Sequence, residues 1–158
     1  MSSTRGAGRS TESTPAEEYA CAHAWVALTA AHSRVASLLA AALARQCGLT
    51  INEFELLLRL DQAGSAGLRL GELRSAVPLT QPALSRAVAR LARRGLLARA
   101  SAPGDGRGVL ILMSEAGQQS LRAAIPVHAE VIRTALLGKL SLAEQDVLAR
   151  VLGRIASA

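Results

Sequence analysis

The chain has 158 residues, of which 50% are hydrophobic and only 2% aromatic, and its formal net charge is +6. This length predicts one domain, or one compact unit with an appended dimerisation region, and the scarcity of aromatic residues favours helix-on-helix packing over a β-sandwich. The sequence contains no glycine-rich phosphate loop, nucleophile elbow or His-Glu-x-x-His motif, so we expect neither an enzyme nor a cofactor. It also lacks the aromatic residues on which RNA-binding modules stack bases.

The N-terminal third of the sequence predicts a polar tail and a long helix. Residues 1–13 are small and polar and are expected to be disordered. Thr14 with Glu17 has the spacing of a capping box, and residues 14–47 are expected to form a first dimerisation helix. A helix of about thirty residues needs a second long surface to pack on, and a second copy of itself supplies one. Its apolar stripe consists of Trp25, Leu28, Val35, Leu38, Leu39 and Leu43.

Residues 50–113 predict a winged helix-turn-helix DNA-binding domain. Thr50 with Glu53 opens a helix to about Ala63, followed by a glycine turn, a short strand at 68–70 and a short helix at 71–77. Thr80 is expected to cap the next helix, which stops at Gly95. Strands at 97–101 and 109–113 then form a hairpin around a tip rich in glycine. The predicted fold class is mainly α with a small β-wing.

Residues 114–158 predict the C-terminal dimerisation helices. Ser114 caps a helix to about Gly138, and Ser141 with Glu144 opens the last helix, which runs to about Ile155. Together with the first helix, these apolar helical ends predict a homodimer.

The positive charge is concentrated between Arg69 and Arg107. This segment holds eight arginines against Glu72 and Asp105, a net charge of +6, whereas the rest of the chain has a net charge of zero. A concentrated basic field attracts a polyphosphate partner, and the helix-turn-helix pattern points to double-stranded DNA.

The helix at 80–94 is expected to read that DNA. On a helical wheel its apolar residues share one side and face the core, while the opposite side is polar. Glutamine and arginine near the start of such a helix pair with base edges in the major groove, and later arginines contact phosphates. We expect DNA contacts from Thr80, Gln81, Pro82, Ser85, Arg86, Arg90, Arg93 and Arg94, and from Arg107 of the wing in the minor groove, with Asp105 supporting Arg107.

The segment LTQPALSRAVARLARRGLL, the Asp105-x-Arg107 wing and the sequence Ser114-Glu115-Ala116-Gly117 resemble the MarR family of winged helix-turn-helix regulators. The resemblance extends from about Ala16 to the C-terminus. It implies a homodimer joined by its first and last helices, a pseudo-palindromic operator, wing arginines in the minor groove and a repressor released by a small ligand. The reading positions that it implies are Gln81, Pro82, Ser85 and Arg86, with Arg107 at the wing.

The resemblance further implies a pocket for an aromatic or anionic ligand between the dimer helices and the winged domain. The residues expected there are Trp25, His32 and Arg34 on the first helix and Phe54 on the second. A tryptophan can stack on a ring, and an arginine can meet a carboxylate.

Two other functions remain open from the sequence: a winged helix used for protein–protein contact, and a thiol-based redox sensor acting through Cys21. The two cysteines, Cys21 and Cys47, are too few for a disulfide framework. His23, His32 and His128 do not have the spacing of a metal site, so no metal is expected.

A cytoplasmic location is expected. The N-terminal residues show no signal peptide, and His32, Ser33 and Arg34 interrupt the most apolar stretch, at 24–44, which makes it a poor membrane span.

Overall fold

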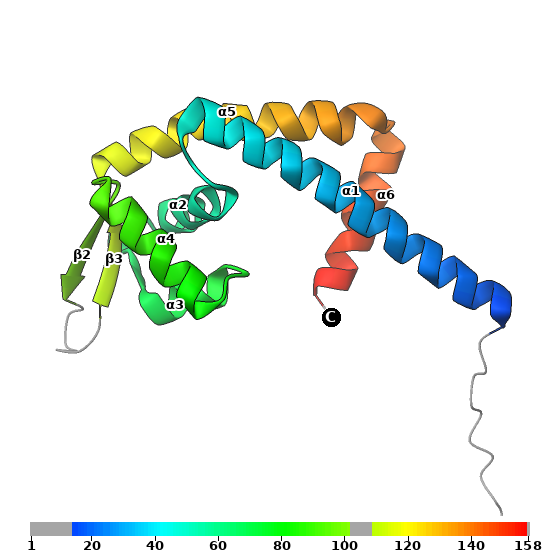
Figure 1. Ribbon diagram of the computed structural model, residues 1–158, viewed down its shortest axis with the longest axis horizontal. Coiled ribbons are helices and arrows are strands. Elements are labelled where there is room, and N and C mark those ends of the chain that lie inside the picture. The colour runs from blue at the N-terminus through cyan, green and yellow to red at the C-terminus, as the bar shows by residue number, and fades with distance from the viewer. Residues whose placement is uncertain (1–13, 102–108, 158) are drawn as a thin grey trace, which may run out of the picture. The chain divides into compact units, whose positions relative to one another are not determined.

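The structure, a computed structural model, describes residues 14–101 and 109–157. The tail at 1–13 and the wing tip with Asp105 and Arg107 lie outside the described residues. The chain divides into two units between Arg34 and Val35, within the first helix. The second unit contains the helix-turn-helix and the sheet (Figure 1).

The described residues are mainly helical with one small sheet, which confirms the predicted fold class. Short 3-10 turns follow α2 and α5, at Gly64–Ala66 and Leu137–Lys139. The helices are α1 (Pro15–Cys47), α2 (Ile51–Ala63), α3 (Leu70–Ala76), α4 (Gln81–Arg93), α5 (Glu115–Ala135) and α6 (Leu142–Ala156), and the strands are β1 (Leu68–Arg69), β2 (Leu97–Ser101) and β3 (Val109–Met113).

Three helices begin at the capping boxes that the sequence predicts. In α2, the Thr50 hydroxyl accepts the backbone N–H of Glu53 at 3.2 Å, and the Glu53 carboxylate accepts the backbone N–H of Thr50 at 2.9 Å. The same reciprocal pair joins Thr14 to Glu17 before α1 and Ser141 to Glu144 before α6. Each box provides partners for backbone donors that have none within the helix, so it fixes the first residue of the helix.

The sheet has the strand order β1-β3-β2, with both pairs antiparallel. In the hairpin, Leu97 is opposite Met113 and Ser101 is opposite Val109, so both predicted strands are confirmed with their predicted ends. Ile111, at the centre of β3, is buried and ties the sheet to the core.

Several element boundaries differ from the sequence prediction. Strand β1 ends at Arg69 and not at Leu70, and α3 ends at Ala76 and not at Val77. Helix α3 begins at Leu70, one residue before the predicted Gly71. Helix α5 ends at Ala135 and not near Gly138, because Leu136 leaves the helical geometry at φ −119° and a 3-10 turn follows. The turn brings Gly138 close to the preceding helical backbone: a Cβ there would lie 2.9 Å from the carbonyl oxygen of Arg133.

The core of the second unit is formed by aliphatic side chains from α2, α3, α4, α5 and the sheet, with Phe54 as its aromatic member. Helix α2 packs against both α4 and α5 and so occupies the centre of this unit. Its central position means that α2 contacts both the helix predicted to meet DNA and the predicted C-terminal dimerisation segment. The most deeply buried large side chains are Leu43, Leu49, Leu56, Leu57, Leu60, Leu73, Leu84, Val88, Leu91, Ile111 and Leu121.

The first part of α1 is exposed in the single chain. Trp25 is 66% exposed and Leu28 is 42% exposed, although both belong to the predicted apolar stripe. By length and composition alone, α1 meets the criterion for a membrane-spanning helix, contrary to the expectation that its apolar stretch at 24–44 is a poor span. The core helix of a soluble protein, which is mostly buried, and a signal sequence near the N-terminus meet the same criterion.

A candidate nucleic-acid interface

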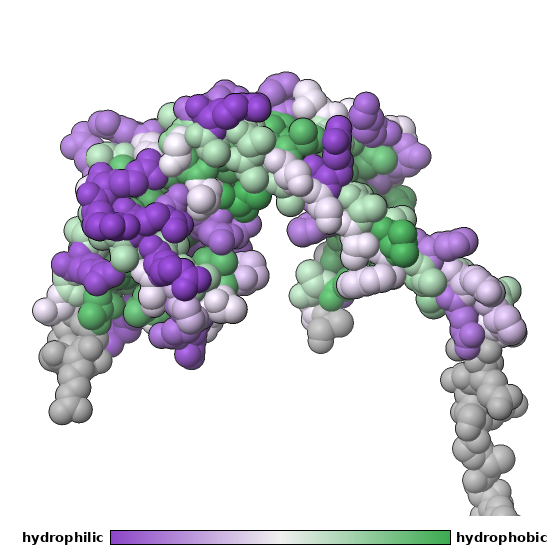
Figure 2. All heavy atoms as spheres, in the orientation of Figure 1, coloured by the Kyte–Doolittle hydropathy of each residue, from purple (hydrophilic) through white to green (hydrophobic). Residues whose placement is uncertain are grey.

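Helix α4 has one buried and one exposed face, as the helical wheel predicts. Leu84, Ala87, Val88 and Leu91 are buried. The residues expected to contact DNA are exposed, and Figure 2 shows hydrophilic side chains gathered over this part of the second unit. The exposed set is Thr80, Gln81, Pro82, Ser85, Arg86, Arg90, Arg93 and Arg94.

The start of α4 is set by its backbone and by Pro82. Thr80 occupies the N-cap position with extended geometry (φ −65°, ψ 151°), and its carbonyl oxygen accepts the backbone N–H of Leu84 at 2.9 Å. Thr80 is therefore the N-cap residue, as the sequence predicts, although its hydroxyl makes no capping hydrogen bond. Pro82 lies in the first turn, where the missing N–H costs nothing because no carbonyl precedes it in the helix.

Arg74 of α3 reaches the first residue of α4. Its Nη1 lies 3.5 Å from the Oε1 atom of Gln81, at the long end of hydrogen-bonding distance. This contact orients the side-chain amide of Gln81 and brings another guanidinium beside the predicted reading positions. Sequence reasoning did not select Arg74, because the two residues face each other only through the turn between the helices.

The arginines of α4 differ in their partners. Arg90 donates from Nε to the Oε1 atom of Glu53 at 2.8 Å, and Arg94 donates from Nη1 to the carbonyl oxygen of Gly48 at 2.8 Å. Within the described parts of the chain, Arg86 and Arg93 are exposed and make no hydrogen bond or ion pair. Arg86 and Arg93 are therefore the α4 arginines with every guanidinium donor available to another molecule, whereas Arg90 has committed its Nε to Glu53.

Glu53 is the one buried charged residue in the described core, with 2% of its surface exposed. Burial acts to raise the pKa of its carboxyl group. Hydrogen bonds from the Thr50 backbone, from Arg90 and from the Thr50 hydroxyl outweigh burial, so the pKa lies below its ordinary value. Glu53 is therefore ionised at neutral pH and forms a salt bridge with the cation on α4.

The hairpin and α5 meet α4 at Ser114. The Ser114 hydroxyl donates to the carbonyl oxygen of Gly95 at 2.6 Å and accepts the backbone N–H of Gly117 at 3.0 Å. Gly95 has φ +70°, a left-handed geometry that lets the chain leave α4 and enter β2. Figure 1 shows β2 and β3 extending side by side from this end of α4, as the wing of a winged helix does.

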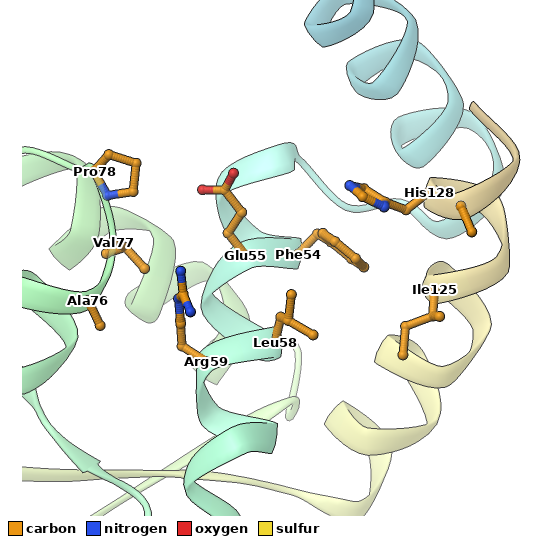
Figure 3. A pocket seen from close by; sticks show the side chains of 10 residues that line it. Phe54, Glu55, Leu58, Arg59, Ala76, Val77, Pro78, Ile125 and His128 are labelled. Atoms are coloured by element: carbon orange, nitrogen blue, oxygen red, sulfur yellow. The ribbon is translucent and has the colours of Figure 1, made fainter. Parts of the chain in front are cut away.

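A pocket of about 510 Å³ is lined by three segments: α2, the turn that leads from α3 into α4, and α5. Figure 3 shows Phe54 and Leu58 on the side of α2 toward Ile125 and His128, and Glu55 and Arg59 toward Pro78. The pocket therefore joins an apolar wall to a pair of charged groups. Its lining residues are Phe54, Glu55, Leu58, Arg59, Ala76, Val77, Pro78, Ile125, His128 and Ala129.

Two rings form part of this lining. Phe54 and His128 stack with ring centroids 4.7 Å apart and an angle of 17° between their planes. Burial lowers the pKa of His128, and the charge of Glu55 opposes that effect only partly, so the imidazole is neutral at pH 7. Sequence reasoning considered His128 only as a metal ligand and missed its place beside Phe54, because the two residues are far apart in the sequence.

Of the predicted ligand residues, Phe54 lines the pocket, whereas Trp25, His32 and Arg34 are exposed on α1 in the first unit. Cys21 is exposed, Cys47 is half-buried, and neither forms a disulfide. Among the described residues, no cluster of three or more His, Cys, Asp or Glu side chains is arranged to hold a metal ion.

An exposed helix at the end of a helix-turn-helix, followed by an antiparallel hairpin, defines a winged helix-turn-helix protein. A family model described as "MarR family" matches residues 48–108. The chain belongs to the MarR family of transcriptional regulators and is not an enzyme.

Several solved structures share this fold. Sco3205 of Streptomyces coelicolor, a MarR family regulator in complex with DNA, is 28% identical, with 94% of this chain and 91% of that chain covered and a TM-score of 0.82. A probable transcriptional regulator from Pseudomonas aeruginosa is 32% identical, with 82% and 94% covered and a TM-score of 0.71. BpsR of Bordetella bronchiseptica is 22% identical, with 97% and 99% covered and a TM-score of 0.77. No curated sequence is similar enough to count as a match.

Proposed function

We propose that this regulator is a cytoplasmic homodimeric repressor that places α4 of each protomer in the major groove of a pseudo-palindromic operator. The observation that carries the proposal is the exposed face of α4, where Gln81, Ser85 and Arg86 lie in the first turns and have no core to contact. A helix-turn-helix presents this part of its second helix to base edges. Sco3205, which shares the fold, is known in complex with DNA.

Within this proposal, Arg86 reads a guanine and Gln81 reads an adenine, because a guanidinium can make two hydrogen bonds to guanine O6 and N7 and an amide can make two to adenine N6 and N7. Arg93 contacts a phosphate. Arg107, on the wing tip outside the described residues, enters the minor groove, and Asp105 holds it in place. Arg74, beside Gln81, adds positive charge at the mouth of the major groove.

The direct test is selection of a duplex from a random-sequence library by the wild-type protein. We expect an enriched site with two inverted half-sites about one helical turn apart, and affinity that falls steeply as salt is raised. Enrichment of no sequence, or binding with no salt dependence, would contradict the proposal and favour a winged helix used for protein–protein contact. Transcription from a promoter that carries the enriched site then distinguishes repression from activation.

The apolar surface outside the core supports the dimer. Among the described residues, Trp25 of α1 and Leu142 and Ile155 of α6 are 66%, 84% and 65% exposed. Large apolar side chains exposed on two terminal helices favour burial against a second copy, because each would otherwise keep its surface in water. A dimer also places two α4 helices in the geometry that an inverted repeat requires.

We further propose that a small aromatic acid binds the pocket beside Phe54 and releases the protein from DNA. The apolar wall with its stacked rings suits a planar ligand, and Arg59 supplies a cation for a carboxylate. The turn at Ala76–Pro78, which leads into α4, forms part of the same pocket, so a bound ligand contacts the segment that sets the start of α4. DNA binding by BpsR is regulated by 6-hydroxynicotinic acid.

Benzoate and 6-hydroxynicotinic acid test this site. We expect at least one of them to weaken binding to the enriched duplex, and Arg59→Gln to abolish that response with DNA affinity unchanged in the absence of ligand. Arg122→Gln, an exposed arginine of α5 outside the pocket, is the matched control and keeps the response. A response that survives in Arg59→Gln would place the ligand elsewhere.

A further inference from the structure

Two of the arginines expected at phosphates are bonded to the junction between α1 and α2. The carbonyl oxygen of Gly48, in the connection between those helices, accepts a hydrogen bond from Arg94. The carboxylate of Glu53, in the first turn of α2, accepts one from Arg90. We infer that Arg90 and Glu53 form a positioning pair that sets how α4 is presented to DNA, and that Arg90 does not act as a phosphate contact. The inference rests on the proposed binding of DNA through α4.

Both carboxylate oxygens of Glu53 accept hydrogen bonds. Its Oε2 atom accepts the Thr50 backbone N–H at 2.9 Å and the Thr50 hydroxyl at 3.0 Å, and its Oε1 atom accepts from Arg90 at 2.8 Å. The group is almost wholly buried, and Arg90 is the only cation that the described residues bring to it. A buried carboxylate that loses its cation keeps an uncompensated charge, so this pair resists separation.

Because Arg90 lies on α4 and Glu53 lies on α2, their salt bridge constrains the orientation of α4. Ala87 and Leu91 beside it face the core and fix the depth of the helix, while the bond to Glu53 fixes its rotation and its position along α2. A guanidinium has a rigid planar fork, so it holds one geometry where a lysine would allow several. Arg86 lies one turn before Arg90 and depends on that rotation to face the groove.

Arg93 provides the contrast within the same helix. It is exposed, it makes no hydrogen bond or ion pair with another described residue, and it carries the same charge as Arg90. These properties leave every donor of Arg93 free for a phosphate, whereas the Nε of Arg90 is already bonded to Glu53. The structure therefore assigns different roles to two arginines that the sequence pattern does not distinguish.

The experiment compares Glu53→Gln, Arg90→Gln, the double variant, Arg90→Lys and the control Arg93→Gln. Each full-length protein is titrated with the duplex that the wild-type protein selects and with a random duplex of equal length, over a range of salt concentrations. Unfolding in denaturant, followed by circular dichroism, identifies conditions in which every variant is folded. The free energies of unfolding of the same variants form a double-mutant cycle, which measures the coupling between Glu53 and Arg90 without DNA.

We expect Glu53→Gln and Arg90→Gln each to lower the ratio of specific to random affinity about three- to tenfold, and the double variant to lose no more than the worse single variant. The slope of log affinity against log salt concentration stays as in the wild type for these variants. Arg90→Lys does not restore the ratio of specific to random affinity. Arg93→Gln instead weakens both duplexes alike and reduces the salt slope by about one.

The inference is overturned if Arg90→Gln behaves like Arg93→Gln, if Arg90→Lys restores binding, or if Glu53→Gln binds as the wild type does. Additive effects of the two single variants, on DNA or on unfolding, would also overturn it. If the wild-type protein selects no duplex, the proposed function itself fails, and this outcome is distinct from the others.

Discussion

Arg86 is the residue on which sequence specificity is expected to depend most. It is exposed in the second turn of α4 and has no partner among the described residues. Arg86→Ala is expected to cost about 1–3 kcal/mol per half-site on the selected duplex and less on a random duplex. Fluorescence anisotropy with both duplexes measures the two losses, and Arg122→Ala, on α5, is the control. Equal losses on the two duplexes would make Arg86 a phosphate contact.

Glu53 gives the protein a specific sensitivity to acid. The pKa of its carboxyl group is lower in the folded chain than its ordinary value of 4.5, so the stability that it supplies is present above that value. The contribution is lost as the pH falls through the lower folded pKa. Glu53→Gln is expected to destabilise the protein by about 1–3 kcal/mol at pH 7, because a charged hydrogen bond is removed.

Denaturant unfolding of the wild type and of Glu53→Gln across the pH range measures this effect. The difference between the two proteins should shrink as the pH falls below about 4.5 and vanish in stronger acid. The other capping boxes provide a comparison, since Glu144 also has a lowered pKa but is fully exposed. A difference that stayed constant down to strong acid would contradict the assignment of the lowered pKa to Glu53.

At the scale of elements, the start of α5 depends on a glycine. A Cβ on Gly117 would overlap the carbonyl oxygen of Leu96 and lie 2.8 Å from the Cγ atom of Met113, so the helix can approach the hairpin this closely only without a side chain. Gly117→Ala is expected to destabilise the protein by at least about 1–3 kcal/mol through overpacking.

Thermal unfolding of Gly117→Ala against Gly71→Ala measures this effect with a matched control. A Cβ on Gly71, in the first turn of α3, meets no atom within 4 Å, so alanine there should be neutral or slightly stabilising. Equal stability of the two variants would mean that α5 and the hairpin can separate without cost.

The elements show which structural features the sequence encodes locally. The boxes at Thr50 and Ser141 and the hairpin at 97–113 depend on residues within a few positions of one another, and the structure has them as predicted. Thr80 is the N-cap residue as predicted, although its hydroxyl makes no capping hydrogen bond. The predicted end of α5 is wrong because a 3-10 turn follows Leu136, and Gln145 of α6 donates to the carbonyl oxygens of Leu137 and Leu140, a contact that no local stop signal predicts.

The candidate site could be predicted only as a list of exposed residues. The pattern of α4 gives its buried and exposed faces, because these follow from helical periodicity. The partners of Arg90 and Arg94 lie 37 and 46 residues away, and no spacing rule joins such positions. The pairing of Phe54 with His128 across two helices is missed for the same reason.

At the scale of the whole molecule, the exposed apolar residues of α1 and α6 predict the oligomeric state. Sedimentation of the wild type at micromolar concentration is expected to show a dimer. Ile155→Asp, which places a charge on an apolar side chain that is 65% exposed in the single chain, should shift the population toward monomer and weaken operator binding. Ser157→Asp, two residues later and already polar, is the control. A wild-type monomer would contradict the proposed dimer.

The hydrogen bonds of Ser114 have a consequence for the spacing of the DNA sequences that the protein is proposed to bind. One hydroxyl joins the carbonyl oxygen that follows α4 to the first turn of α5, and the hairpin leaves and returns at that same point. The base of the hairpin therefore keeps a constant offset from α4. If α4 and the wing bind DNA as proposed, an operator that accepts α4 must offer its minor groove at a set number of base pairs from the bases that α4 contacts. The spacing between the two recognised sequence blocks would thus be invariant among the promoters that this protein controls, even where the bases between them differ.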